Sequence, residues 1–329
     1  MSDLQPSFTD AEYGMRRRLT RRQAFLTMMD DVIPWDQWCQ VIRPFYYDGA
    51  KGRKPVGLET ILRMYLLQVW FNLSDEAVED QVNDSYAMRQ FMKLDFTRQQ
   101  VPDATTLLHF RHLMEDKGLG KALFDSQNQF LEGQGLIMRG GSVVDATIIS
   151  APSSTKNRQE ARDPAMHQAR KGSQWYFGFK AHIGVDLGTG LVHTVTVTAA
   201  NVSDVVEAPN LVRFDDQVVY ADAGYQGIGK RDEVVKDEHL AGVDFRVAVK
   251  KSMIAGMSLF DQRLESRKAS VRARVEHPFL ILKRDFGFVK TRYRGLVKNL
   301  NRCHVGFASA NLLMIARAQA IDHRVITPG

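Results

Sequence analysis

The spacing of apolar residues divides the 329-residue chain into a helical first part and a strand-rich second part. In the first part apolar side chains recur at steps of three and four residues, the period of an amphipathic or buried helix. Ser74 and Asp103 precede two of these runs and are expected to cap their helices. The predicted helices are Trp35–Phe45, Leu58–Leu73, Asp75–Asp84, Ala104–Lys117 and Gly118–Gly135. We therefore predict an all-helical N-terminal domain over residues 1–138.

Beyond Gly141 the pattern changes to short β-branched runs, which indicate strands. The predicted strands are Ser142–Ser150, Trp175–Asp186, Leu191–Ala200, Val218–Asp222 and Gly242–Val249. The second and third are expected to form a hairpin across Leu187–Gly190. Helices are expected over Gln226–Leu240, Arg272–Lys283 and Asn301–Ala318. The order β-β-β-α-β-α predicts an α/β domain over residues 139–329, with a mixed five-stranded sheet.

A long polar segment, at about residues 150–175, separates the first two predicted strands. Segments of this length inside a compact domain are usually functional or disordered. Its cationic residues are Lys156, Arg158, Arg162, Arg170 and Lys171. We interpret it as a basic insertion that clamps a phosphate backbone, with a plain surface loop as the alternative.

Charge narrows the choice of partner further. The formal net charge is +6 and the isoelectric point is about 9.2, which fits a nucleic-acid partner without requiring one. The excess of positive charge is concentrated between Arg263 and Arg302, a stretch with twelve lysines and arginines and three acidic residues.

The two cysteines have no spacing typical of a zinc site, and no apolar run has the length of a membrane span. With no apolar signal peptide at the start, we expect a cytoplasmic protein.

Three carboxylates stand out against these patterns. Asp145 lies within an otherwise apolar strand, and Asp222 ends another. Glu276 lies in a strongly basic stretch, where Arg272, Glu276 and Lys283 fall on one face of an ideal helix that Pro278 should kink. Taken singly, each has an ordinary interpretation as a turn residue, a cap or a surface ion pair. Together they are typical of carboxylates that hold a divalent metal ion.

The segments around these residues carry a family resemblance. In order along the chain they are VDATIISAPSST, FGFKAHIGVD, TAANVSD, ADAGYQG, VRARVEHPF and KRDFGFVKTRYRGL. The chain, from about Leu19 to about Leu313, resembles the DDE transposases of the insertion-sequence-five family of bacterial insertion sequences. The resemblance implies a ribonuclease-H-like catalytic core with Asp145, Asp222 and Glu276 as catalytic and metal-binding residues. Ala269 stands where the wider group often has Tyr, which puts an aromatic contact to the DNA end in doubt.

The resemblance also implies a function. The protein would bind the terminal inverted repeats of an insertion sequence, cleave the ends by metal-dependent hydrolysis and join the 3′-OH to target DNA. The implied cofactor is Mg²⁺, as two ions that Mn²⁺ can replace, and the implied state on double-stranded DNA is a homodimer, associated with the nucleoid. The residues expected to contact DNA are Arg272, Lys283, Lys180, Arg274, Arg284, Arg292 and Arg294. The alternatives are a ribonuclease-H-like nuclease or resolvase and a domesticated DNA-binding regulator without catalysis.

Overall fold

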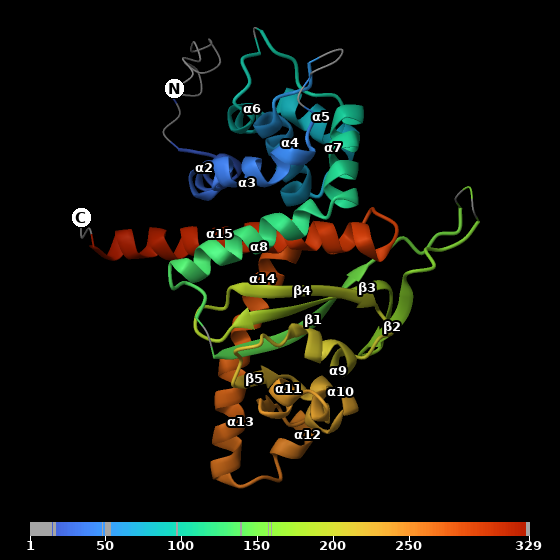
Figure 1. Cartoon of the computed structure of the whole chain (residues 1–329), viewed down its shortest axis with the longest axis vertical. Helices are drawn as coiled ribbons and strands as arrows, with labels where there is room; N and C mark the ends of the chain where they lie inside the picture. Colours follow the sequence, from blue (N-terminus) through green and yellow to red (C-terminus); the bar gives the residue numbers. More distant parts are fainter. Residues whose placement is uncertain are drawn as a thin grey trace. The chain divides into compact units, whose positions relative to one another are not determined.

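The computed structural model describes residues 15, 18–47, 49, 54–96, 98–138, 140–156, 158 and 160–326, with side chains up to residue 320 apart from that of Lys251. The chain divides into two compact units, residues 1–117 with 312–329 and residues 118–311 (Figure 1). The helix predicted over Gly118–Gly135 belongs to the second unit rather than to the first. The basic run Arg16–Arg22, which the sequence predicts to open a helix as a solvated face or a phosphate-contacting segment, is described only in part, because Arg16 and Arg17 lie outside the described residues.

The first unit is helical, as the apolar spacing predicts. Its elements are α2 (Arg21–Val32), α3 (Trp35–Ile42), the 3₁₀ turn η1 (Arg43–Phe45), α4 (Leu58–Phe71), α5 (Asp75–Asp84), α6 (Tyr86–Met92) and α7 (Ala104–Asp116). Both predicted caps are confirmed, because the Ser74 hydroxyl accepts the amide of Ala77 and the Asp103 carboxylate accepts that of Thr106. Helix α4 is buried along residues 61–70 and forms the centre of this unit.

The second unit contains a mixed sheet of six strands, which confirms the predicted α/β class. The strands are β1 (Gly141–Ser150), β2 (His167–Lys171), β3 (Gln174–Asp186), β4 (Val192–Ala199), β5 (Val218–Ala221) and β6 (Asp244–Val247). Their order is β2-β3-β1-β5-β6, with β4 also paired to β3. Strand β1 runs antiparallel to β3 and parallel to β5, and β5 runs parallel to β6. The prediction of five strands is one short, because β2 lies in the segment expected to be a loop.

The predicted hairpin is confirmed, with a turn that its own side chains stabilise. Strand β3 ends at Asp186, whose carboxylate accepts hydrogen bonds from the amides of Gly188 and Thr189 and from the Thr189 hydroxyl. A second hairpin joins β2 to β3 across Gly172, whose φ of 63° suits a residue without a side chain. Strand β3 therefore pairs with a neighbour on each side, β1 on one and its hairpin partners β2 and β4 on the other.

Helices of different lengths accompany the strands of the second unit. The longer ones are α8 (Leu119–Gly133), α13 (Leu259–Arg272) and α15 (Leu296–Ile326), and α15 continues into the first unit beyond residue 311. The short ones are α9 (Asp204–Glu207), η2 (Ala208–Leu211), η3 (Ala223–Tyr225), η4 (Ile228–Lys230), α10 (Asp232–Val235), α11 (Glu238–Ala241), α12 (Lys251–Ile254), η5 (Ala273–Val275), α14 (Glu276–Leu280) and the π-helical turn η6 (Ile281–Asp285). The single helix predicted over Gln226–Leu240 is wrong. Gly227 has a φ of 89° and Arg231 is extended, so the backbone leaves the helical region twice.

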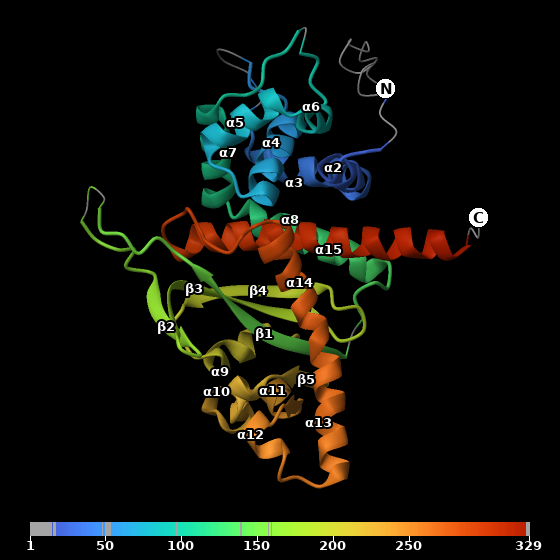
Figure 2. The ribbon, with the colours of Figure 1, turned by 180° about the vertical axis from the view of Figure 1, so that it is seen from behind.

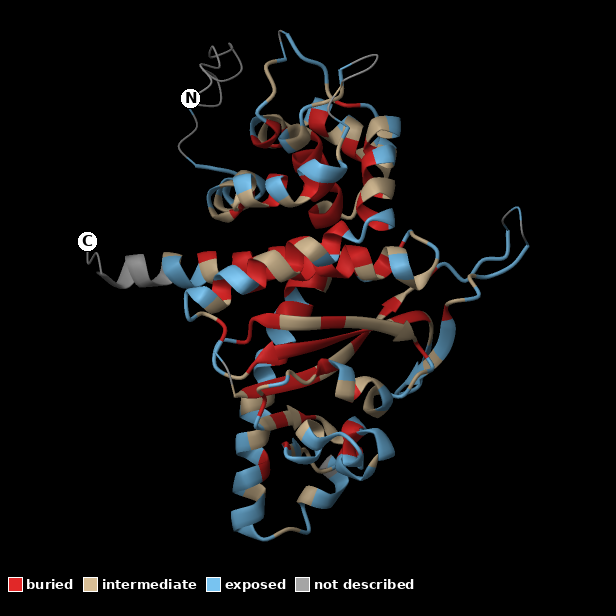
Figure 3. Ribbon diagram, viewed as in Figure 1, coloured by how far each residue is buried: buried red, intermediate tan, exposed pale blue. Residues whose placement is uncertain are grey.

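The apolar core beneath the strands holds the sheet and its loops together. Val144 of β1 and Val219 and Ala221 of β5 are buried with Tyr225 and Ile228 from the turns after β5. Figure 3 shows β1 and β3 largely buried, whereas α13 is mostly exposed. From behind, α13 and α14 cross one face of the sheet near β1 (Figure 2). Among the described residues no helix is both long and apolar enough to cross a membrane.

Candidate active site

Asp145 on β1 and Asp222 directly after β5 lie close together, because these two strands are parallel neighbours. The register pairs Val144 of β1 with Ala221, the last residue of β5, so the next residue along each chain segment is one of the two aspartates. Both side chains are partly buried. The negative charge of Asp222 raises the pKa of Asp145, as expected for two carboxylates at close range. The structure therefore brings together the two aspartates that the strand pattern singles out.

Local hydrogen bonds fix the orientation of both aspartates. Asp222 stands at the N-cap of η3, and its Oδ1 accepts the amide of Gly224 at 2.8 Å. Asp145 Oδ1 accepts the amide of Ala146 at 2.7 Å. In each case one carboxylate oxygen is bonded to the backbone. A carboxylate held by one oxygen in this way can offer its other oxygen to a ligand.

The pKa of Asp145 is raised from 3.8 to about 6, and burial is the largest cause. The charges of Asp222 and Asp204 contribute to this rise, whereas the Ala146 amide and the Arg272 guanidinium oppose it. Because the folded state binds this proton more tightly than the unfolded state, the free energy of unfolding falls as pH rises from 3.8 to about 6. Above pH 6 the metal-free protein carries the whole cost of this buried charge.

We therefore expect Asp145→Asn to stabilise the metal-free protein at pH 8 by about 1–3 kcal/mol, since a shift of one pKa unit corresponds to about 1.4 kcal/mol. Denaturant unfolding in the presence of EDTA measures this difference. At pH 4 the gain should disappear, because the wild-type carboxyl is then mostly protonated. The exposed Asp232, paired with Lys236, provides the control substitution Asp232→Asn. An equal or lower stability of Asp145→Asn at pH 8 would contradict this assignment.

Glu276 begins α14, directly after the 3₁₀ turn η5 that follows α13. Turn η5 contacts β1 and β3, so the segment reaches the strand that carries Asp145. Glu276 itself is exposed. Arg272 ends α13, and its charge lowers the pKa of Asp145, which places its guanidinium near the aspartates. The helix expected here, with a kink at Pro278, is instead divided by a 3₁₀ turn before Glu276 and by a π-helical turn after Leu280.

Two lysines predicted to contact DNA have partners within the protein. Lys283 donates to the carbonyl of Ile148 at 2.8 Å, and burial followed by the charge of Lys171 lowers its pKa. It thereby ties the segment after Glu276 to β1. Lys180 donates to the carbonyl of Val202 and forms an ion pair with Asp204, both at 2.8 Å. Both lysines therefore have structural partners besides any phosphate they contact.

The remaining predicted DNA contacts are exposed arginines. Arg274 donates to the carbonyl of Leu187, Arg284 pairs with Asp285, and Arg294 donates to the carbonyl of Arg162. Arg292 is exposed as well. Such surface bonds contribute little to stability and are readily exchanged for a phosphate. The geometry leaves these four guanidinium groups accessible for a polyanion.

Asp204 lies near the aspartate pair, whereas the sequence predicts only that Ser203 or Asp204 caps a helix towards Arg213. The charge of Asp204 raises the pKa of Asp145 and that of Tyr225, which follows Asp222 by three residues. Ser203 occupies the N-cap of α9 without a side-chain hydrogen bond, and Asp204 is the first residue of this helix. An aspartate at the start of a helix does not by its sequence position distinguish a cap from a site residue.

The aspartate pair fits a divalent cation. Carboxylate oxygens are the ligands that Mg²⁺ and Mn²⁺ prefer, and a cation would offset the mutual repulsion that raises the pKa of Asp145. Across the part of the chain that the structure describes, no three His, Cys, Asp or Glu side chains converge closely enough to hold a metal ion. Asp145 and Asp222 are adjacent. Glu276 does not complete a three-ligand group with them in the described part of the chain.

Comparison with known proteins agrees with this geometry. Residues 138–312, more than half of the chain, match the family model described as "Transposase DDE domain". Residues 15–113 match a second model, "Transposase domain (DUF772)". No solved structure matches the chain. The chain therefore belongs to the DDE transposase family, and its mixed sheet with flanking helices is the ribonuclease-H-like core of that class. It is a DNA transposase, a class that generally uses divalent metal ions, and its partner is DNA.

Proposed function

We propose that this transposase belongs to the insertion-sequence-five family and performs both chemical steps of transposition. It binds the terminal inverted repeats of its element, cleaves the DNA at the ends by hydrolysis and joins the freed 3′-OH to target DNA. The observation that carries this proposal is the adjacency of Asp145 and Asp222 on β1 and β5. The segments that resemble the family support it as well, because they contain both aspartates and Glu276.

In this proposal Asp145 and Asp222 hold a divalent cation, Mg²⁺ or Mn²⁺, and Glu276 is the third catalytic carboxylate. When bound, such cations activate water or a 3′-OH and stabilise the leaving oxygen of a phosphodiester. Arg272, beside the aspartates, neutralises charge on the scissile phosphate, a role that its forked guanidinium suits. Turn η5 brings the Glu276 segment to β1, and Lys283 ties the following turn to the same strand.

The DNA would extend from the aspartates over the exposed cations of the second unit. Arg274, Arg284, Arg292 and Arg294 supply contacts to phosphates, which position the duplex without reading its sequence. Lys180 and Lys283 lie closer to the centre and contact the phosphates next to the cleaved bond. The basic segment at about 150–175 contains β2, which pairs with β3, the neighbour of β1. Two such protomers would hold the two ends of the element as a homodimer.

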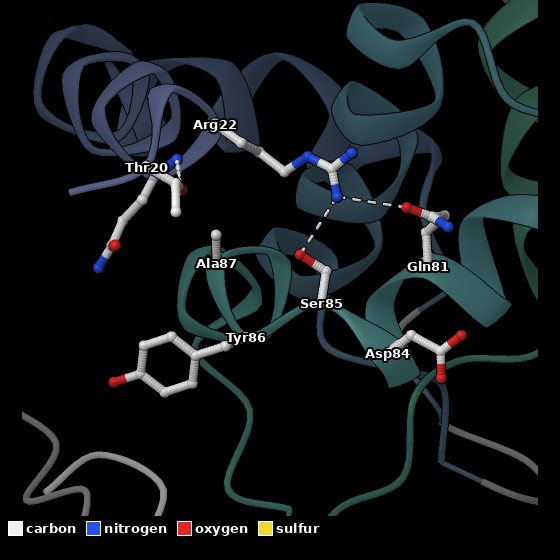
Figure 4. Close-up of a pocket in the computed structure, with 8 residues that line it drawn as sticks. Thr20, Arg22, Gln81, Asp84, Ser85, Tyr86 and Ala87 are labelled. Atoms are coloured by element: carbon white, nitrogen blue, oxygen red, sulfur yellow. Dashed lines mark hydrogen bonds between the residues drawn. The ribbon is translucent and has the colours of Figure 1, made fainter. Parts of the chain in front are cut away.

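We propose that the helical first unit, residues 1–117 of the region 1–138 predicted from the sequence, binds DNA and joins the protomers. A polar cavity of about 360 Å³ lies between α2, α5 and α6. In Figure 4 the guanidinium of Arg22 extends across it towards Gln81 and Ser85. Its bonds to these two side chains are long, at 3.3 and 3.4 Å, and exposed. A phosphate oxygen would be a stronger, charge-assisted partner for this guanidinium.

Arg22→Ala is expected to weaken binding to a terminal-repeat duplex and to lower the slope of log affinity against log salt by about one, as for the loss of one phosphate contact. Fluorescence anisotropy over a series of salt concentrations gives both values. Arg98→Ala is the control, because Arg98 is exposed in the same unit and pairs with Asp95 away from the cavity. Equal affinity and slope for Arg22→Ala and wild type would exclude this contact.

Cleavage and joining of the element's own ends test the proposed function as a whole. A labelled duplex with the terminal repeat reports hydrolysis, and a pre-cut duplex with a free 3′-OH reports strand transfer to a plasmid. The proposal predicts both products, and predicts that EDTA removes both. Hydrolysis without strand transfer would instead identify a nuclease or resolvase. Binding without either product would identify a regulator.

A further inference from the structure

A third aspartate stands next to the Asp145–Asp222 pair. Asp204 is the first residue of α9, and α9 contacts the turn η3 that follows Asp222. The backbone of Gly224 shows how close the two carboxylates are. A Cβ atom placed on Gly224 would lie 2.9 Å from Asp222 Oδ1 and 3.8 Å from Asp204 Oδ2. Both carboxylates therefore lie close to the backbone of Gly224.

Two residues of β3, Lys180 and His182, lie next to the Asp204 carboxylate. The Lys180 ammonium lies 2.8 Å from its Oδ1 and also donates to the carbonyl of Val202. His182 is fully buried, and its Nδ1 lies 3.9 Å from the same Oδ1 without forming a hydrogen bond to any described residue. Its Nε2 is bonded to the Thr198 hydroxyl at 2.8 Å. Among the described residues Lys180 supplies the close cation to this carboxylate, and a buried nitrogen of His182 lies 3.9 Å from it.

A buried hydroxyl among these carboxylates has no hydrogen-bond partner. Tyr225 has no exposed surface, and its hydroxyl is unbonded within the described part of the chain. Burial raises its pKa most strongly, and the charges of Asp145, Asp204 and Asp222 follow in that order. A buried hydroxyl is usually bonded to the protein or to ordered water. Tyr225 lies in η3, which follows Asp222 and contacts α9, so its unbonded hydroxyl leaves room for a polar partner such as water next to these two carboxylates.

We propose that Asp204 is a positioning residue of the cation site, which raises the affinity of the Asp145–Asp222 pair for a divalent ion through its charge and through ion-bound water. Lys180 sets the strength of this effect by neutralising Asp204. The proposal rests on the cation site proposed above. Direct ligation is not required, since no three carboxylates converge on one point within the described residues. Partners of this kind, one step removed from the ion, commonly change metal affinity by about 10–100-fold.

The charges predict opposite effects for the two members of the ion pair. Removing the charge of Asp204 takes a negative group away from the site and weakens cation binding. Removing the charge of Lys180 takes away the positive group that offsets Asp204, so cation binding becomes stronger. A purely structural ion pair would give no such reversal, because both substitutions would only loosen α9. The sign of the Lys180 effect therefore separates an electrostatic role from a structural one.

Electron paramagnetic resonance of free Mn²⁺, titrated with the full-length protein without DNA, measures this affinity. We expect Asp204→Asn to lower the Mn²⁺ affinity about tenfold or more, and Lys180→Met to raise it several-fold. The exposed pair Asp232 and Lys236 gives matched controls, Asp232→Asn and Lys236→Met, which should leave the affinity unchanged. Circular dichroism melting of each variant checks the fold, and Lys180→Met alone decides the question if Asp204→Asn does not fold.

Unchanged Mn²⁺ affinity in Asp204→Asn, or a lower affinity in Lys180→Met, would overturn the assignment of Asp204. Asp222→Asn, measured in the same way, separates this result from a failure of the proposed function. If Asp222→Asn loses Mn²⁺ binding while Asp204→Asn retains it, the cation site is supported and only the role proposed for Asp204 is wrong. If neither substitution affects binding, the ion lies elsewhere and both proposals are wrong.

Discussion

Asp222→Asn is expected to reduce cleavage of a terminal-repeat DNA end by about 10³-fold or more, the order of effect seen when a central electrostatic group of an active site is removed. Asparagine has nearly the same shape, and its side-chain oxygen can still accept the Gly224 amide that the carboxylate accepts at 2.8 Å. The substitution therefore removes a charge and a cation ligand without disturbing η3. Single-turnover cleavage in Mg²⁺, followed on a denaturing gel, measures the rate.

Asp145→Asn should show a loss of the same order, and the double variant little more than either alone, because groups that act as one unit do not add. Binding of both variants to the same duplex should equal or exceed that of wild type, since each has lost a negative charge beside the DNA. Asp232→Asn is the control for cleavage and should retain the wild-type rate. Cleavage within tenfold of wild type by either active-site variant would remove that aspartate from the mechanism.

Arg63→Ala is expected to destabilise the first unit by about 3–5 kcal/mol, the cost of breaking a buried charged network. Only 1% of the Arg63 side chain is exposed. Its guanidinium lies 2.8 Å from Asp30 and 2.7 Å from Glu59, donates to the carbonyl of Phe91, and stacks 3.8 Å from the ring centre of Trp35. The substitution leaves Asp30 without its buried partner and opens a cavity beneath Trp35.

Urea unfolding, followed by tryptophan fluorescence, measures this loss. Lys93→Met provides the matched control, because Lys93 pairs with the same Asp30 at 3.2 Å but lies half exposed at the surface. A surface pair of this kind contributes about 0–1 kcal/mol. Equal effects of the Arg63 and Lys93 substitutions would show that burial of the network does not matter.

Much of the fold could be predicted because its elements have strong local signals. The apolar period of α4, the caps Ser74 and Asp103, and the hairpin turn at Asp186 all follow from rules that act within a few residues. Strand β2 was missed because its sequence, HQARK, has no apolar face. It forms through backbone pairing with β3 at the margin of the sheet, where side-chain burial is not needed. Only tertiary pairing identifies such a strand.

The site could be predicted only in part, because two of its carboxylates have a local sequence signal and the third does not. Asp145 and Asp222 interrupt apolar strands, so a buried charge is visible in the sequence itself. Asp204 gives no such signal, because an aspartate before a short helix is usually a cap. Its proximity to Asp222 depends on how α9 packs against η3. The division of the Glu276 helix also depends on packing, since the bond from Lys283 to Ile148 joins residues that are distant in the sequence.

A divalent ion is expected to bind to the side chains of Asp145 and Asp222, and localised cleavage of the polypeptide tests this most directly. Fe²⁺ bound in place of Mg²⁺, with ascorbate and peroxide, generates hydroxyl radicals that cut the chain close to the ion. The account predicts fragments that end near Asp145 and near Asp222, suppressed by excess Mg²⁺ and absent from Asp222→Asn. Cuts at other positions only, or the same cuts in Asp222→Asn, would contradict it.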